Sequence, residues 1–276
     1  MEVWSIVVLG YAECMVGVAI AFLFGLAYGS FLNVVILRFD DWQAIVKTRS
    51  HCPNCKTLLS WWDLVPLLSF SYLLGKCRYC RKPISWQYPI VELLTAALIA
   101  AGYYLLFITQ SLAMWQSVVG LAALILVIGA MVTIFVHDLT EMMVPDLMAN
   151  ILLIAAIIYA LVVHQDYMGS VYAAAMGFVP IMLLVYPSRG KWMGEGDVKI
   201  AGALAILVGW PSAVVFMVAA FMIGGAFGSI ALLTHKVKMK TAVPFGPFLI
   251  LAAIIALFWG GNIVDWYLGT IGYGYY

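Results

Sequence analysis

The sequence predicts an all-α polytopic membrane protein with about eight transmembrane helices. Apolar residues make up 65% of its 276 residues and charged residues only 10%, against roughly half and a quarter in soluble domains. About 20 apolar residues cross the hydrocarbon core, so each long apolar stretch is a candidate helical pass. Eight such stretches occur, at 3–37, 89–108, 114–136, 147–163, 171–187, 198–210, 212–233 and 243–263.

The first stretch is expected to stay as a membrane anchor, because it has no basic region before it and is too long for a signal peptide core. All fourteen basic residues fall in three segments, 38–88, 189–199 and 236–240. With eight passes these segments share one side of the membrane, which the positive-inside rule makes cytoplasmic. Both termini are then expected outside.

Residues 39–88, between the first and second passes, are expected to form a small cytoplasmic module. Charge, Pro and Cys rise together there, and so short a unit needs a staple such as a metal. Two Cys-x-x-Cys pairs, Cys52 with Cys55 and Cys77 with Cys80, have spacing close to that of four-thiolate zinc sites. Four ligands leave no open position, so the sequence predicts a structural zinc module.

Three other interpretations of these cysteines are weaker. Disulfides are disfavoured in the reducing cytoplasm. Iron in a rubredoxin-like site uses similar knuckles and stays open as an alternative. His51 could replace one thiolate, although a histidine at that position is more typical of a solvated loop.

Two carboxylates, Asp138 and Asp197, adjoin apolar helices at the predicted cytoplasmic ends. Carboxylates at membrane depth are costly and occur mainly where they do chemistry. The stretch 198–210 is only about 20 Å long as a helix, which places Asp197 below the membrane surface. Two carboxylates sharing a proton can activate water and protonate a scissile carbonyl, as in aspartic proteases. We therefore expect a hydrolytic pair.

The glycines at 194 and 196 are expected to let the backbone turn tightly beside Asp197 and approach a reacting chain. A simpler alternative makes Asp197 a helix N-cap and Asp138 an interfacial charge.

Other polar groups near helix ends have ordinary interpretations. Asp146 suits the N-terminal turn of the fourth helix, and His137 suits the membrane interface. Glu92 is either a buried functional carboxylate or a partner of its helix dipole.

Six motifs, taken in order, resemble those of the bacterial type IV prepilin peptidases. They are Gly29–Arg38, the double Cys-x-x-Cys, Gly75–Ser85, Tyr88–Thr95, His137–Asp146 and Gly194–Lys199. With two further apolar passes after the last motif, the resemblance covers nearly the whole chain. One mild departure is His137, which stands where an apolar residue is more common.

The resemblance implies an aspartic endopeptidase of the Gly-x-Gly-Asp class in the bacterial inner membrane. Such enzymes remove the basic leader of type IV prepilins or type II secretion pseudopilins at the cytoplasmic face. Members with a large first cytoplasmic loop usually also methylate the new N-terminal residue with S-adenosylmethionine. By position, Asp138 and Asp197 become the catalytic pair, and zinc is bound by Cys52, Cys55, Cys77 and Cys80.

The implied organisation has three parts: a first transmembrane helix at 1–38, a zinc module associated with methyl transfer at 39–88, and a transmembrane peptidase domain at 89–276. The expected partners are prepilins or pseudopilins and the lipid bilayer, with no nucleic acid. Glu141 and Glu195 are candidate acidic groups for holding a basic leader.

Two other functions compete with this one. A Gly-x-Gly-Asp protease could act on other membrane substrates, but the cysteine module argues against it. A transporter could relay protons or cations through the carboxylates; against it, both lie at one membrane face rather than at the midplane.

Overall fold

The computed structural model describes residues 2–39, 41–190, 193–234 and 243–271. Within these ranges the regular elements are helices, and the only β-pairing is two isolated bridges. Four of the basic residues used to predict the topology, Lys191, Lys236, Lys238 and Lys240, lie outside the described residues.

The structure confirms the predicted fold class of an all-helical, multi-pass membrane protein. Among the described residues, seven helices are long and apolar enough to span a membrane. Helices suit this setting because they satisfy their own backbone hydrogen bonds in lipid. The seven are α1 (Glu2–Leu37), α4 (Gln87–Tyr104), α5 (Met114–Glu141), α6 (Asp146–Tyr159), α7 (Tyr167–Ser188), α9 (Ser212–Leu233) and α10 (Gly246–Thr270). Short π-helical turns, η2 (Leu105–Thr109) and η3 (Ala160–His164), extend α4 and α6 to spans of 23 and 19 residues.

The sixth predicted pass is a helix too, α8 (Glu195–Val208), but it has only 14 residues. It is therefore not among the span-length helices. All nine of its residues from Ile200 to Val208 are buried, so protein rather than lipid surrounds it.

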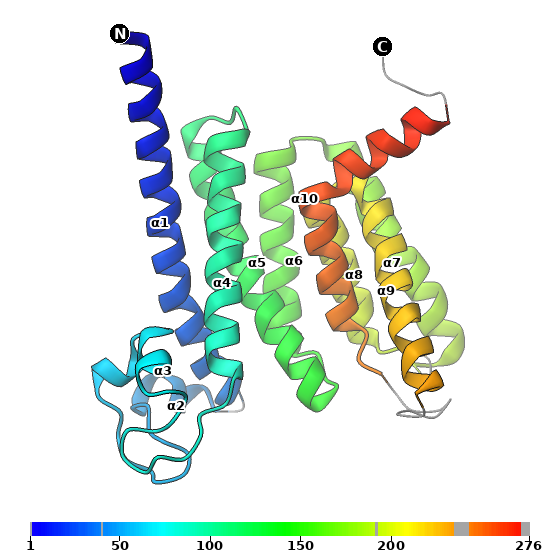
Figure 1. Cartoon of the computed structure of the whole chain (residues 1–276). Coiled ribbons are helices and arrows are strands. Elements are labelled where there is room, and N and C mark those ends of the chain that lie inside the picture. The colour runs from blue at the N-terminus through cyan, green and yellow to red at the C-terminus, as the bar shows by residue number, and fades with distance from the viewer. Residues whose placement is uncertain (1, 40, 191–192, 235–242, 272–276) are drawn as a thin grey trace. The chain divides into compact units, whose positions relative to one another are not determined.

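The chain divides into two compact units, Met1–Leu121 and Ala122–Tyr276, here called the N-terminal and C-terminal units. In the N-terminal unit α1 packs along α4. The chain between these helices forms the cysteine module, with the short helices α2 (Trp42–Lys47), η1 (Trp61–Leu64) and α3 (Leu68–Tyr72) (Figure 1).

Glycines of α1 allow its backbone to approach α4 closely. A Cβ at Gly25 would lie 2.5 Å from the Ala96 Cα, and one at Gly29 would lie 2.7 Å from the Glu92 Cα. Small residues at helix contacts permit such close packing in membranes. The buried Asn33 adds a polar link, because its Nδ2 donates to the carbonyl of Tyr88 at 3.3 Å.

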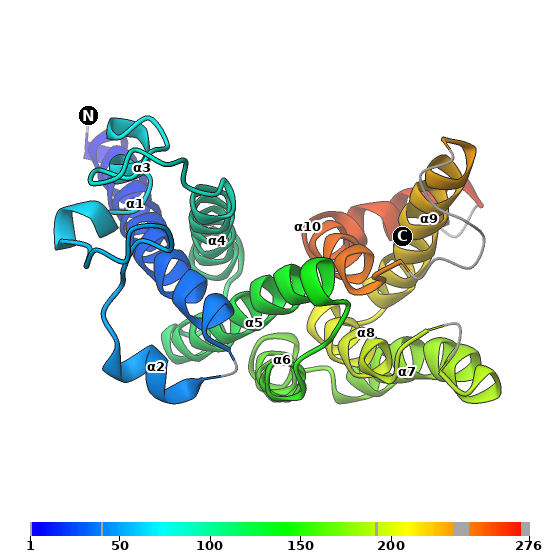
Figure 2. The same cartoon turned by 90° about the horizontal axis from the view of Figure 1, so that it is seen from below.

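In the C-terminal unit α8 lies among α6, α7 and α10 and packs against all three (Figure 2). Its side chains at Ile200, Leu204 and Leu207 are almost completely buried. The end of α5 and the beginnings of α8 and α10 lie at the same end of this unit (Figure 1). This end holds the carboxylates.

We expect Gly25→Ala to destabilise the protein by about 1–3 kcal/mol, because the new methyl group would meet backbone rather than a movable side chain. Thermal unfolding of the purified protein in detergent measures the effect. Gly228→Ala in α9 is the matched control, since a Cβ there meets nothing within 4 Å. Equal unfolding midpoints for the two variants would contradict close packing at Gly25.

Candidate active site and cysteine cluster

Asp138 lies in the last turn of α5 and is only 5% exposed. Its Oδ2 accepts a hydrogen bond of 2.9 Å from the backbone N–H of Gly246, the first residue of α10. A helix N-terminus carries partial positive charge, so α10 stabilises the ionised form of Asp138. The carboxylate is thus a held, buried group and not the interfacial charge of the simpler interpretation.

Asp197 is the third residue of α8 and is 8% exposed. Its Oδ2 accepts a hydrogen bond of 3.3 Å from the backbone N–H of Gly194, which is the N-cap residue. The alternative interpretation of Asp197 as the N-cap is therefore wrong by three positions. Asp197 instead accepts the N–H of the N-cap residue from the third position of α8.

The structure brings these two carboxylates close together. Burial, and then the charge of Asp138, raise the pKa of Asp197 to about 7. Asp197 lies in the first turn of α8, which is not one of the seven span-length helices. Two like charges at short range oppose the ionisation of both groups, which favours a single shared proton on the pair.

Gly196 allows the loop after α5 to pack against the start of α8. A Cβ at Gly196 would lie 2.7 Å from the Cβ of Val144, which belongs to the loop between α5 and α6. Gly196 is helical and Gly194 has a φ of −74°, so the expected tight turn does not form there. The second glycine is needed for close packing between the two segments that carry the aspartates.

The remaining polar groups at this end of the C-terminal unit are less directly connected to the two aspartates. Lys199 of α8 forms an ion pair of 2.6 Å with Asp146, which stands in the first turn of α6 as expected. Glu141 and Glu195 are exposed, and His137 is buried beside Asp138 in the sequence. Sequence reasoning missed Gly246; the available signal was Pro244-Phe-Gly-Pro247, directly before the last apolar stretch.

Glu92 belongs to the N-terminal unit and is buried. One of its oxygens accepts a hydrogen bond of 2.9 Å from the backbone N–H of Leu67, a residue with a φ of +57°. Glu92 therefore ties the cysteine module to α4, a role that sequence position alone did not reveal.

The four cysteines of the module come together as one cluster. Their sulfur atoms all lie within 4.8 Å of one another, and Cys52 Sγ is 3.9 Å from Cys80 Sγ. A tetrahedral zinc ion with bonds of about 2.3 Å places its sulfurs about 3.8 Å apart. The thiols are free of disulfides, as expected for this module, and His51 is not part of the cluster. The cluster could hold a metal ion.

The two knuckles repeat the same backbone pattern. Cys52 N–H donates to Thr57 at 3.0 Å, and Cys77 N–H donates to Lys82 at 2.9 Å. The residues that follow each pair, Lys56 and Arg81, both have positive φ, at 58° and 60°. Each knuckle thus presents two thiolates from an equivalent turn.

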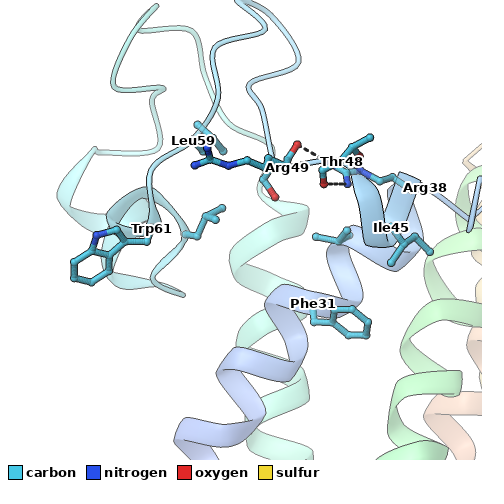
Figure 3. A pocket seen from close by; sticks show the side chains of 10 residues that line it. Phe31, Arg38, Ile45, Thr48, Arg49, Leu59 and Trp61 are labelled. Atoms are coloured by element: carbon cyan, nitrogen blue, oxygen red, sulfur yellow. Dashed lines mark hydrogen bonds between the residues drawn. The ribbon is translucent and has the colours of Figure 1, made fainter. Parts of the chain in front are cut away.

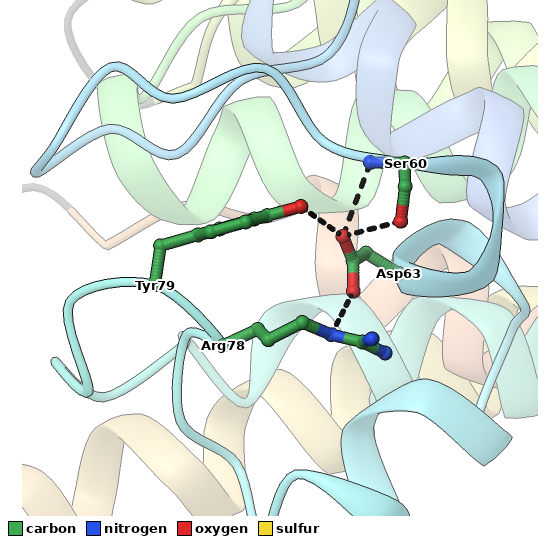
Figure 4. A network of polar contacts seen from close by, with 4 residues as sticks. All are labelled: Ser60, Asp63, Arg78 and Tyr79. Atoms are coloured by element: carbon green, nitrogen blue, oxygen red, sulfur yellow. Dashed lines mark hydrogen bonds and ion pairs between the residues drawn. The ribbon is translucent and has the colours of Figure 1, made fainter.

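Asp63 links the segment after the first knuckle to the second knuckle (Figure 4). Its Oδ1 pairs with Arg78 at 2.8 Å, while its Oδ2 accepts hydrogen bonds from Ser60 and Tyr79. Burial opposes the charge, yet the hydrogen bonds from Ser60 and the Arg78 charge hold the pKa of Asp63 below its usual value. The network keeps the two halves of the cluster together.

The unequal pKa values of the thiols favour a bound cation. Hydrogen bonds to Thr57 lower the pKa of Cys55 to about 6. A hydrogen bond with the Lys82 backbone lowers the pKa of Cys80, but burial and the neighbouring thiols raise it overall to about 11. A divalent ion among the four sulfur atoms would favour the thiolate forms and offset the repulsion between them.

Comparison with known proteins gives a consistent result along the chain. The bacterial peptidase A24 N-terminal domain matches residues 23–106, and the type IV leader peptidase family matches residues 125–229. A prepilin leader peptidase/N-methyltransferase of Aeromonas salmonicida (strain A449) is 33% identical over 92% of this chain and 94% of its own. Proteins of the same name from Bacillus subtilis (strain 168) and Legionella pneumophila are 31% and 30% identical over 91% and 90% of this chain, and over 97% and 93% of their own. No solved structure matches.

We expect Gly196→Ala to lower the unfolding midpoint of the purified protein, because its methyl group would overlap Val144. Gly194→Ala should have a much smaller effect, since its nearest neighbour would be 3.7 Å away. Adding Val144→Gly, which removes the Cβ as well as both γ-methyl groups, to Gly196→Ala should restore much of the loss. A double variant no more stable than Gly196→Ala alone would show that Val144 is not the obstacle.

Proposed function

The chain belongs to the type IV leader peptidase family, and we propose that it is a membrane aspartic endopeptidase that removes the leader of type IV prepilins or pseudopilins and N-methylates the new N-terminus. The observation that carries the peptidase activity is the buried pair of Asp138 and Asp197, which interact across the ends of α5 and α8. Chemistry of this kind needs two carboxylates that share a proton.

The unequal surroundings of the two aspartates suggest their roles. Asp138, held by the Gly246 N–H, is the ionised base that takes a proton from the attacking water. Asp197, with its raised pKa, carries the proton and donates it to the scissile carbonyl oxygen. As the tetrahedral intermediate collapses, Asp197 takes that proton back and Asp138 passes its own to the leaving amine. The pair then again holds one proton.

The charge distribution supports a site at the cytoplasmic face of the inner membrane. Eight basic residues lie in 38–88, between α1 and α4. Arg189 and Lys199 lie at the carboxylate end of the C-terminal unit. By the positive-inside rule both places are cytoplasmic. A substrate helix in the bilayer would then bring its basic leader to the pair, near the exposed Glu141 and Glu195.

Within this proposal residues 1–38 anchor the chain, the module at 39–88 supports methyl transfer, and the peptidase lies in 89–276. The carboxylates and the glycines that hold them all fall in the C-terminal unit. Zinc bound by the four cysteines would stiffen the module without joining the reaction, because no ligand position stays open. S-adenosylmethionine would supply the methyl group.

Asp138→Asn and Asp197→Asn should each lower cleavage of a prepilin by at least about 10²–10⁴-fold, since each removes one partner of the proton exchange. Cleavage by purified protein in liposomes, followed by the loss of leader mass, measures the effect. Asp146→Asn is the control, because that carboxylate is exposed and forms an ion pair with Lys199. Normal cleavage by either dyad variant, with Asp146→Asn also active, would rule out the pair.

Purified protein should contain one zinc ion per chain by elemental analysis, and Cys77→Ser should lose it while His51→Ala keeps it. With S-adenosylmethionine present, mass spectrometry should show that the zinc-free variant still cleaves a prepilin but methylates it poorly. Iron in place of zinc would correct the metal assignment. Equal loss of cleavage and methylation would contradict separate supports for the two activities.

A further inference from the structure

The N-terminal unit contains a pocket that neither activity uses. Its volume is about 340 Å³, within the range of small-molecule sites. The wall comes from three segments: the last turns of α1, the helix α2 with the residues after it, and the first cysteine knuckle with η1 (Figure 3). The lining residues are Phe31, Val34, Arg38, Ile45, Thr48, Arg49, Ser50, Leu59, Trp61 and Leu64.

The two arginines of the pocket differ in the hydrogen bonds that their side chains make. The Arg38 guanidinium donates to the carbonyls of Ala44 and Thr48 at 2.8 Å and to that of Arg49 at 3.2 Å, so it braces the wall. The Arg49 side chain is exposed and has no ion pair or side-chain hydrogen bond within the described parts of the chain. Figure 3 shows it reaching across the pocket toward Leu59. None of the ten lining residues is acidic.

The pocket lies where α1 leaves the membrane. Phe31 and Val34 belong to the last turns of the candidate span Met15–Leu37, so the apolar part of the pocket lies at the end of that span. Nearby, Trp61 and Trp62 stack with ring centroids 3.7 Å apart and are 65% and 59% exposed. Tryptophan concentrates at the headgroup level of membranes. An apolar base with a cation above it at this depth fits an amphiphile with an anionic head.

We propose that this pocket binds the headgroup of an anionic phospholipid, with the phosphate on Arg49 and the acyl chains along Phe31 and Val34. A guanidinium binds phosphate through paired hydrogen bonds, and basic pockets beside membrane helices on the cytoplasmic side hold such headgroups. S-adenosylmethionine fits less well, because its sulfonium and ammonium charges would meet a lining without carboxylates. The inference depends on α1 crossing the membrane and is independent of the carboxylate pair.

Native mass spectrometry of the full chain in detergent tests the site, using phosphatidylglycerol and phosphatidylcholine with identical acyl chains. The wild type should retain phosphatidylglycerol in preference, and Arg49→Gln should lower that retention about tenfold. Arg81→Gln removes another exposed cation, outside the pocket, and should retain lipid normally. Val34→Phe, which fills the apolar base without changing charge, should lower retention as well.

Four results would overturn the assignment. Undiminished retention by both Arg49→Gln and Val34→Phe would place the lipid elsewhere, and equal retention of the two lipids would remove the role of charge. Competition by glycerol 3-phosphate at equal concentration would make this a site for soluble phosphates. Displacement by S-adenosylmethionine would make it the methyl-donor site.

Discussion

The structure of the C-terminal unit depends on keeping two carboxylates inside an apolar helical bundle. A buried charge is costly unless backbone or side-chain groups hold it. Here the donors are backbone N–H groups at the starts of two helices, Gly246 for Asp138 and Gly194 for Asp197. Such donors need no side chain and do not reorganise. They can therefore hold a carboxylate before any substrate arrives.

This requirement accounts for the unusual features of α8. The helix is short and is buried from Ile200 to Val208, and in its partly exposed first turn Asp197 is itself buried. Its side chains at Ile200 and Leu204 pack it against its neighbours, and Gly196 allows contact with Val144. Close packing at both points holds the two aspartates in one geometry. The proposed division into a base and an acid depends on this geometry.

The N-terminal unit contains a small module that other kinds of interaction hold together. Its module is too small to bury a core of its own, and it relies on a four-thiol cluster, the Asp63 network and the hydrogen bond from Leu67 to Glu92. Candidate spanning helices hold it at both ends, and the Arg49 pocket lies at the end of the candidate span of α1. The two units thus hold their buried polar groups by different interactions.

Local pattern in the sequence determined the helical membrane class, the approximate position of the long helices and the cysteine cluster, because apolar length and Cys-x-x-Cys spacing act over short distances. It also singled out both aspartates as candidates. Only the tertiary structure decided how they are held. Gly246 is 108 positions from the carboxylate that it binds, and Gly196 meets a loop from another part of the chain. No periodicity records such contacts, because they arise from packing of distant helices; for the same reason Glu92 and the Arg49 pocket became interpretable only in the folded chain.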